Sequence, residues 1–496
     1  MTARNPIIPG LAPDPSACQV GDTTYVVNSS FTWLPGLPIF ASDDLASWEL
    51  IGHALTEDNA GPLDLGLGHE SQGIFAPTLR HIGGLFVLVC TTVVGEASRS
   101  FVMTAQRAEG PWSQPRFLDG AGGIDPDVFE DEDGTVWWTG TRLAADPLWE
   151  QQTQIWTRPV DLDAAAFTGE ETVIWHGAVE GAVWSEGPHI YRIGDWYYLL
   201  TAEGGTAEEH SVSIARARSV TGPWEGCKRN PVFTHRNLGR AAEVHNVGHA
   251  DLLRRPDGSW WAVMLGVRLR GNHHLLGRET FLCPVTWEDG WPVFAPGLGR
   301  LPEAIDVRPG IDPYARSLAP ASSPDEARAR DIPAAHLRAR GIRPVGADWA
   351  DTDRADFHGT PAAHWQCSIS IASRDAEEPG RTGDALRIGI VADSRNWLRL
   401  GVDDASRVVA QRSREGRIDD LVIAEAAEDR LWLRLDDTRI HVGTGADDGL
   451  GAARTLDARW LSTESVGGFT GCLLGVWGAA PDTDIPVRLT GTRLRS

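Results

Sequence analysis

One pattern recurs five times in the first 265 residues: a glycine-centred turn followed by a run of aromatic and aliphatic residues. The turns lie at Gly21, Gly83, Gly134, Gly194 and Gly258, so successive copies are 51 to 64 residues apart. A glycine beside Asp or another glycine, with β-branched and aromatic residues after it, is a hairpin signal. A repeat of this length fits propeller blades of about four strands. Residues 1–300 are therefore predicted to form a five-bladed β-propeller.

The pattern ends near residue 300. Residues 301–343 are rich in Pro, Ala and Arg and are predicted to be a connector. Short strand-like runs separated by polar turns then return over 344–496, at His364–Ile371, Ala385–Val391, Trp397–Val402, Arg430–Leu435 and Leu473–Trp477. This spacing is typical of a β-sandwich. The fold class is therefore all-β: a five-bladed β-propeller followed by a C-terminal β-sandwich, expected to be concanavalin A-like.

A short segment that begins polar and continues apolar precedes each glycine turn. These segments include Asp14, Phe75, Asp125, Glu186 and His249. Four of the five also carry Pro, which is tolerated at the first residue of a strand. Each segment is predicted to be the innermost strand of its blade, and innermost strands surround the propeller axis. Asp14, Asp125, Glu186 and His249 should therefore meet in one small volume, with Phe75 on the fifth wall.

Three carboxylates at one axis suit the cleavage of a glycosidic bond, which needs one carboxyl group as a proton donor and a second on the opposite side of the sugar. A third negative charge raises the proton affinity of the acid. Taken singly, Asp14 could shape a turn, Asp125 or Asp127 could cap one, and His249 could be a core histidine. Their shared place in separate repeats favours a site. A sugar-binding propeller without catalysis stays as an alternative, although binding alone does not require three carboxylates.

Composition limits the partners. The formal charge of −23 argues against nucleic acid and against an anionic membrane surface. The first residues, Met1 to Gly10, lack the apolar region of a secretory signal. Six cysteines lie scattered without metal-ligand spacing, as expected of free thiols. A cytoplasmic location and no required cofactor are predicted.

Five motifs resemble the β-xylosidase branch of the family 43 glycoside hydrolases. They are the run from Asn5 to Ser16, the segments around Asp125 and Glu186, Val247-Gly-His249-Ala-Asp-Leu, and Leu276-Gly-Arg278-Glu-Thr-Phe. The resemblance is dense from residue 5 to about residue 300. It continues weakly to Gly467-Gly-Phe469-Thr-Gly-Cys.

The resemblance implies a role for each matched residue. Asp14 falls on the general base, Glu186 on the general acid, and Asp125 on the residue that tunes and orients the acid. Arg278 falls on the arginine that contacts the innermost sugar, and Phe469 on a phenylalanine at the pocket rim. Phe31, Phe75 and His249 are also expected to contact substrate, although Phe75 stands where the branch usually has Trp.

The resemblance also implies a reaction. It predicts an exo-acting, inverting enzyme that releases xylose from the non-reducing end of short β-1,4-xylo-oligosaccharides. An α-L-arabinofuranosidase is the alternative, because both sugars are pentoses with similar hydroxyl directions. A structural calcium ion near His249, held mainly through water, and assembly into a homo-oligomer both stay open.

Overall fold

The computed structural model describes residues 1–63, 65, 71–311, 313–314, 329–332, 343–344, 356–359, 364–370, 387–445, 451, 453–477 and 487–492. The chain forms two compact units. The first comprises Met1–Ile8, Ala12–Arg268 and Arg278–Pro320, and the second comprises Pro9–Leu11, Leu269–Gly277 and Ala321–Ser496.

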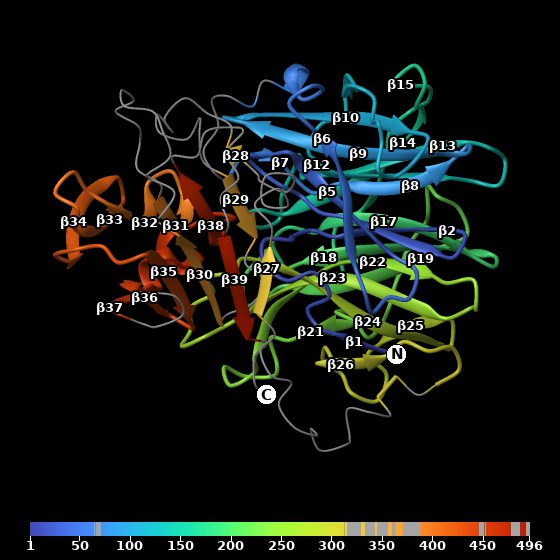
Figure 1. Ribbon diagram of the computed structural model, residues 1–496. Coiled ribbons are helices and arrows are strands. Elements are labelled where there is room, and N and C mark those ends of the chain that lie inside the picture. Colours follow the sequence, from blue (N-terminus) through green and yellow to red (C-terminus); the bar gives the residue numbers. More distant parts are fainter. Residues whose placement is uncertain are drawn as a thin grey trace. The chain divides into compact units, whose positions relative to one another are not determined.

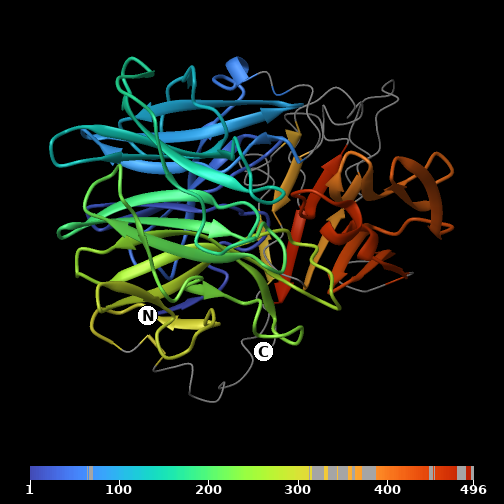
Figure 2. The ribbon, with the colours of Figure 1, turned by 180° about the vertical axis from the view of Figure 1, so that it is seen from behind.

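The described part of the first unit contains five antiparallel sheets of four or five strands each (Figures 1 and 2). The first sheet has β2 (Ser16–Val20), β3 (Thr23–Val27), β5 (Gly36–Ser42) and β6 (Glu49–Leu55). The second has β7 (Gly73–Ile74), β8 (Thr78–Ile82), β9 (Leu85–Val94), β10 (Ala97–Ala105) and β11 (Arg116–Phe117). The third has β12 (Ile124–Glu130), β13 (Val136–Leu143), β14 (Thr153–Asp161), β15 (Ala166–Phe167) and β16 (Thr172–Trp175).

The fourth sheet has β17 (Glu186–Ile193), β18 (Trp196–Glu203), β19 (Ser211–Ala217), β20 (Glu225–Gly226) and β21 (Phe233–Thr234). The fifth has β22 (Val244–Arg254), β23 (Trp260–Arg268), β24 (Glu279–Glu288) and β25 (Trp291–Phe294). The short strand β4 (Trp33–Leu34) and the 3-10 turn η1 (Gly61–Leu63) lie in connections. No helix in the described part of the chain is long and apolar enough to cross a membrane.

The innermost strands form a closed ring. β2 contacts β8, β8 contacts β12, β12 contacts β17, β17 contacts β22, and β22 contacts β2. Each predicted glycine turn joins the innermost strand of its sheet to the following strand, and all five glycines have positive φ, between 58° and 85°. An L side chain rarely adopts this conformation, so glycine is the residue that closes such a turn without strain. Apolar side chains fill the space between sheets, as Trp138 and Trp156 do between the second and third.

The described part of the second unit contains two six-stranded antiparallel sheets. One has the order β27 (Ala329–Ile332), β39 (Val487–Thr492), β30 (His364–Ser370), β35 (Arg430–Asp436), β36 (Arg439–Gly445) and β37 (Ala453–Asp457). The other has the order β29 (Asp356–Gly359), β38 (Leu473–Trp477), β31 (Arg387–Asp393), β32 (Asn396–Val402), β33 (Val408–Arg414) and β34 (Arg417–Ala424). One apolar core joins the two sheets and includes Ile390 and Leu433. The remaining elements are the strand β28 (Arg343–Pro344), the 3-10 turn η4 (Arg459–Leu461) and the helix α2 (Thr463–Val466).

The all-β prediction of a propeller and a C-terminal sandwich is confirmed, but the two units do not divide at the predicted boundaries. Part of the expected connector, residues 301–343, belongs to the first unit, because β26 (Ala304–Asp306) pairs with β1 (Thr2–Arg4). This pairing buries Ala3 and Ile305. Another part, β27, pairs with β39 of the second unit. Long-range strand pairing, which composition does not reveal, is the reason for the difference.

The five cysteines with described side chains, Cys18, Cys90, Cys227, Cys283 and Cys472, are buried free thiols. The side chain of Cys367 lies outside the described part of the chain.

Candidate active site

Asp14 lies directly before β2, in the left-handed backbone region with φ of 52°. Its carboxylate is buried and accepts hydrogen bonds from Arg278 Nη1 at 2.8 Å and from Ser29 Oγ at 2.6 Å. Burial alone would raise the pKa of Asp14. The positive charge of Arg278, assisted by His249 and by the Ser29 hydroxyl, outweighs burial and holds the pKa below its ordinary value. Asp14 is therefore an ionised carboxylate at neutral pH.

Asp125 and Glu186 come from neighbouring inner strands, β12 and β17. Asp125 has φ of 53° and lies in a bulge, since the register shifts between Ile124 and Asp127. A second register shift follows Glu186. Bulges redirect side chains at the ends of paired strands. Asp125 Oδ2 accepts a hydrogen bond from the Gly187 backbone N–H at 3.1 Å, which places the third carboxylate beside the residue after Glu186.

These two buried carboxyl groups bind protons more tightly than isolated ones. Burial and then the negative charge of Asp14 raise the pKa of Asp125 to about 7. Burial, followed by the charges of Asp125 and Asp14, raises the pKa of Glu186 well above its ordinary value. The pKa values of Glu186 and Asp14 are thus shifted in opposite directions, up for Glu186 and down for Asp14, which is the arrangement that general acid and base catalysis uses.

His249 lies in β22 with φ of 49° and is buried. Its Nδ1 is 3.9 Å from Asp14 Oδ1. Burial lowers the pKa of His249 to about 4, so the imidazole is neutral at neutral pH. Its ring packs closely on Gly187: a Cβ there would lie 3.0 Å from the ring carbon Cε1, and the φ of 55° at this residue also favours glycine.

An aromatic pair borders this cluster. Phe31 and Phe75 meet edge to face with their ring centroids 5.5 Å apart. The Arg278 guanidinium carbon lies 5.5 Å from the centroid of the Phe31 ring. The structure thus brings together seven predicted residues of the first unit: Asp14, Asp125, Glu186, His249, Arg278, Phe31 and Phe75. Phe469 is in the second unit, between α2 and β38, and its place at a pocket rim stays a prediction.

The family model "Glycosyl hydrolases family 43" matches residues 3–292. The chain belongs to this family. The chain is 46% identical over 308 residues to a "Xylosidase/arabinosidase" of Butyrivibrio fibrisolvens, covering 62% of this chain and 59% of that protein. The "Non-reducing end alpha-L-arabinofuranosidase BoGH43B" of Bacteroides ovatus is 32% identical, with 96% of this chain and 91% of that protein covered.

Solved structures agree with these matches. The structure titled "Bacteroides ovatus Xyloglucan PUL GH43B" has a TM-score of 0.78 at 29% identity and covers 100% of both chains. The GH43 protein BlXynB of Bacillus licheniformis has a TM-score of 0.78 at 26% identity, covering 99% of this chain and 100% of that one. The predicted family and the predicted glycosidase class are therefore confirmed.

The family 43 site has supporting residues that the sequence did not single out. Ser29 binds Asp14, and Arg80 and Asp251 pair along the axis. His210 is buried beside the β22 backbone, with Nδ1 2.9 Å from the Asn246 carbonyl oxygen. Asp251 stands two residues after His249, and Asp127 two residues after Asp125. Comparing these second positions across the repeats, where Ser16 also falls, would have found Asp127 and Asp251 but not Arg80, which stands five residues after Phe75.

The surroundings of His249 bear on the expected calcium ion. In the part of the chain that the structure describes, no group of three or more His, Cys, Asp and Glu side chains has an arrangement that could hold a metal ion. The Asp14 carboxylate near His249 is already bound by Arg278 and Ser29. These side chains do not form a set of direct oxygen ligands of the kind calcium requires. A calcium ion held through water near His249 stays a prediction, and the mechanism below uses no metal.

Proposed function

We propose that this family 43 glycosidase is an exo-acting, inverting enzyme that releases xylose from the non-reducing end of short β-1,4-xylo-oligosaccharides. The observation that carries this proposal is the contrast between two buried carboxyl groups at one axis. The surroundings of Asp14 hold it ionised, whereas those of Glu186 keep it protonated to higher pH.

In this proposal, Glu186 donates its proton to the leaving oxygen as the glycosidic bond breaks. Asp14 removes a proton from the water that attacks the anomeric carbon from the opposite side. Asp125 keeps the pKa of Glu186 high through its negative charge and orients the acid through the Gly187 N–H. After one turnover Asp14 releases its proton to solvent and Glu186 takes one up from solvent, which restores the starting protonation states.

The remaining site residues bind the terminal sugar. The Arg278 guanidinium binds Asp14 through Nη1, and a guanidinium presents a fork of N–H donors that can also bind sugar hydroxyls. Phe31 and Phe75 offer apolar ring surface to the sugar, and neutral His249 can exchange hydrogen bonds with a hydroxyl. Phe469 is assigned to the pocket rim by the resemblance alone.

An α-L-arabinofuranosidase is the second candidate, and one comparison favours it. The Bacteroides ovatus relative, which matches 96% of this chain, carries that name. A direct comparison of kcat/KM on 4-nitrophenyl β-xyloside and on 4-nitrophenyl α-L-arabinofuranoside separates the two candidates. A preference for the arabinofuranoside would overturn the xylosidase proposal.

The role of Glu186 is tested with Glu186→Gln. The variant should lose activity on xylobiose by a factor of about 10²–10⁴, because general acid catalysis typically contributes that much. It should lose far less on 4-nitrophenyl β-xyloside, whose leaving group needs little protonation. Equal losses on both substrates would contradict the role.

Stereochemistry tests the role of Asp14. Proton NMR of the first-formed sugar should show the anomeric configuration opposite to that of the substrate. Retained configuration would mean that a carboxylate attacks the sugar directly, and it would remove the proposed water.

A further inference from the structure

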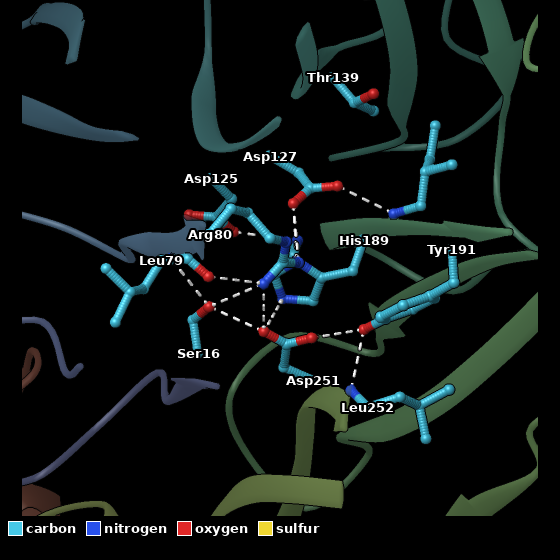
Figure 3. Close-up of polar contacts among 12 residues, drawn as sticks. Ser16, Leu79, Arg80, Asp125, Asp127, Thr139, His189, Tyr191, Asp251 and Leu252 are labelled. Carbon is cyan, nitrogen blue, oxygen red and sulfur yellow. Dashed lines mark hydrogen bonds and ion pairs between the residues drawn. The ribbon is translucent and has the colours of Figure 1, made fainter. Parts of the chain in front are cut away.

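A buried ionic network links the inner strands of the propeller (Figure 3). At its centre is Arg80 of β8, the inner strand of the second blade. Arg80 Nη2 lies 2.8 Å from Asp127 Oδ1, and Arg80 Nη1 lies 2.8 Å from Asp251 Oδ2. Both aspartate side chains are fully buried, with 0% of their surface exposed. Arg80 Nη2 also lies 3.0 Å from His189 Nδ1 of β17, and Nη1 lies 3.3 Å from Ser16 Oγ of β2, so the single guanidinium joins the inner strands of all five blades.

Each aspartate also binds a neighbouring inner strand. Asp251 Oδ2 accepts hydrogen bonds from Ser16 Oγ at 2.7 Å and from the Ala17 N–H at 2.9 Å, and Tyr191 donates to Asp251 Oδ1 at 2.5 Å. Asp127 Oδ2 accepts a hydrogen bond from the Ile190 N–H at 2.9 Å.

Two aspartates of β12 therefore hold the backbone of β17 within a bulge and just after it. Asp125 binds the Gly187 N–H at 3.1 Å, and Asp127 binds the Ile190 N–H at 2.9 Å. Glu186 itself pairs with Ala202 of β18, but the register shift between Glu186 and His189 leaves the residues between them outside the ladder. Regular pairing does not fix the backbone within a bulge, so these two carboxylates help to fix the backbone that directly follows Glu186.

We propose that Asp127, held in place by Arg80, is a positioning residue for Glu186. It fixes β17 against β12, so that the acid stays beside Asp125 and in line with the leaving oxygen. The inference rests on the proposed function, because it assumes that Glu186 is the general acid.

Arg80 is suited to this task by both charge and shape. A buried carboxylate without a partner is costly, and the planar guanidinium presents two donors to two separate carboxylates at once. A lysine would keep the charge but carries it at a single point, so it could not hold Asp127 and Asp251 in the same geometry. The network therefore specifies how far apart the inner strands of the second, third and fifth blades lie.

The test measures leaving-group dependence in Asp127→Asn and in Arg80→Lys. A displaced acid should slow the cleavage of xylobiose by a factor of about 10–100, since misplacement by about 1 Å costs about that much. Hydrolysis of 4-nitrophenyl β-xyloside, which needs little protonation, should fall by no more than about 5-fold. KM for both substrates should stay nearly constant, because neither residue contacts the sugar in this proposal.

Asp131→Asn is the matched control. Asp131 follows β12 directly and accepts hydrogen bonds from Arg192 Nη1 at 3.1 Å and from Tyr197 Oη at 2.8 Å. It therefore joins the same two blades at the other end of β12 and β17, away from Glu186. This variant should show the same ratio of rates on the two substrates as the unaltered enzyme.

Three results would overturn the inference: unchanged kinetics in Asp127→Asn, equal losses on the two substrates, or the same change of ratio in Asp131→Asn. If Asp127→Asn does not fold, Arg80→Lys decides by the same criterion. Glu186→Gln, measured in the same assays, distinguishes the acid role of Glu186 from the positioning role of Asp127. If Glu186→Gln loses activity equally on the two substrates, the proposed acid itself is rejected. If Glu186→Gln shows the leaving-group effect but Asp127→Asn and Arg80→Lys do not, only the positioning role is rejected.

Discussion

Replacing Arg278 by alanine removes a guanidinium that serves two partners at once. One partner is Asp14, 2.8 Å away and buried, and the other is the proposed terminal sugar. A hydrogen bond from a charged donor contributes about 1.5–3 kcal/mol, so losing the sugar contacts alone lowers kcat/KM by about 10–150-fold. Loss of the charge also raises the pKa of Asp14, since burial is then opposed only by weaker partners such as His249 and Ser29.

The base must be ionised to act, so a higher pKa for Asp14 moves the acidic limb of the kcat/KM profile to higher pH. The total loss in Arg278→Ala at neutral pH should reach about 10²–10³-fold, or about 2.7–4 kcal/mol of transition-state stabilisation. The assay is the pH dependence of kcat/KM on 4-nitrophenyl β-xyloside, normalised to folded enzyme, because an unpaired buried carboxylate also destabilises the fold.

Arg278→Lys is the matched variant for this experiment. It keeps a positive charge near Asp14 but cannot hold two oxygens in a fork. Its acidic limb should stay close to that of the unaltered enzyme, while KM rises. An acidic limb that does not move in Arg278→Ala would refute the electrostatic link between Arg278 and Asp14.

Three further predictions concern other parts of the chain. Asp125→Asn removes a negative charge that raises the pKa of Glu186, so the basic limb of kcat/KM should move to lower pH in the same assay; an unmoved limb would contradict the tuning role. Burial tends to raise the pKa of Glu464, but the hydrogen bond and charge of His274 outweigh burial and lower this pKa from 4.5 to about 2. The ionised Glu464 carboxylate therefore stabilises the fold above pH 4.5, and this stabilisation is lost as the pH falls towards 2. The stability difference between the unaltered enzyme and Glu464→Gln, measured by urea unfolding, should therefore shrink over this range, and a constant difference would argue against the linkage. Deletion of residues after 343 should abolish activity, because the second unit holds Leu269–Gly277, directly before Arg278, through hydrogen bonds such as Cys472 N to the Leu275 carbonyl at 2.6 Å; a folded propeller with full activity would contradict this.

The sequence alone determined the repeating architecture. Each hairpin depends on a local rule: a glycine that accepts positive φ, followed by residues that favour strands. Gly21 and its four counterparts were therefore visible without any tertiary information. The same repeat aligned the starts of the inner strands. It predicted that Asp14, Asp125, Glu186 and His249 lie together, and the structure brings them together.

Tertiary structure alone decided which partners these residues have. Arg278 binds Asp14 across 264 residues of sequence, and nothing local to either residue specifies that contact. Strand alternation placed Asp125 and Asp127 on one face and could not choose between them. The bulge between Ile124 and Asp127 separates them, directing Asp125 to Gly187 and Asp127 to Arg80. The unit boundaries likewise follow from the distant pairing of β1 with β26 and of β27 with β39. Local patterns report turns and strands because their causes lie within a few residues. Ion pairs, bulges and pKa values depend on which distant side chains share a buried volume, and the folded chain alone defines that volume.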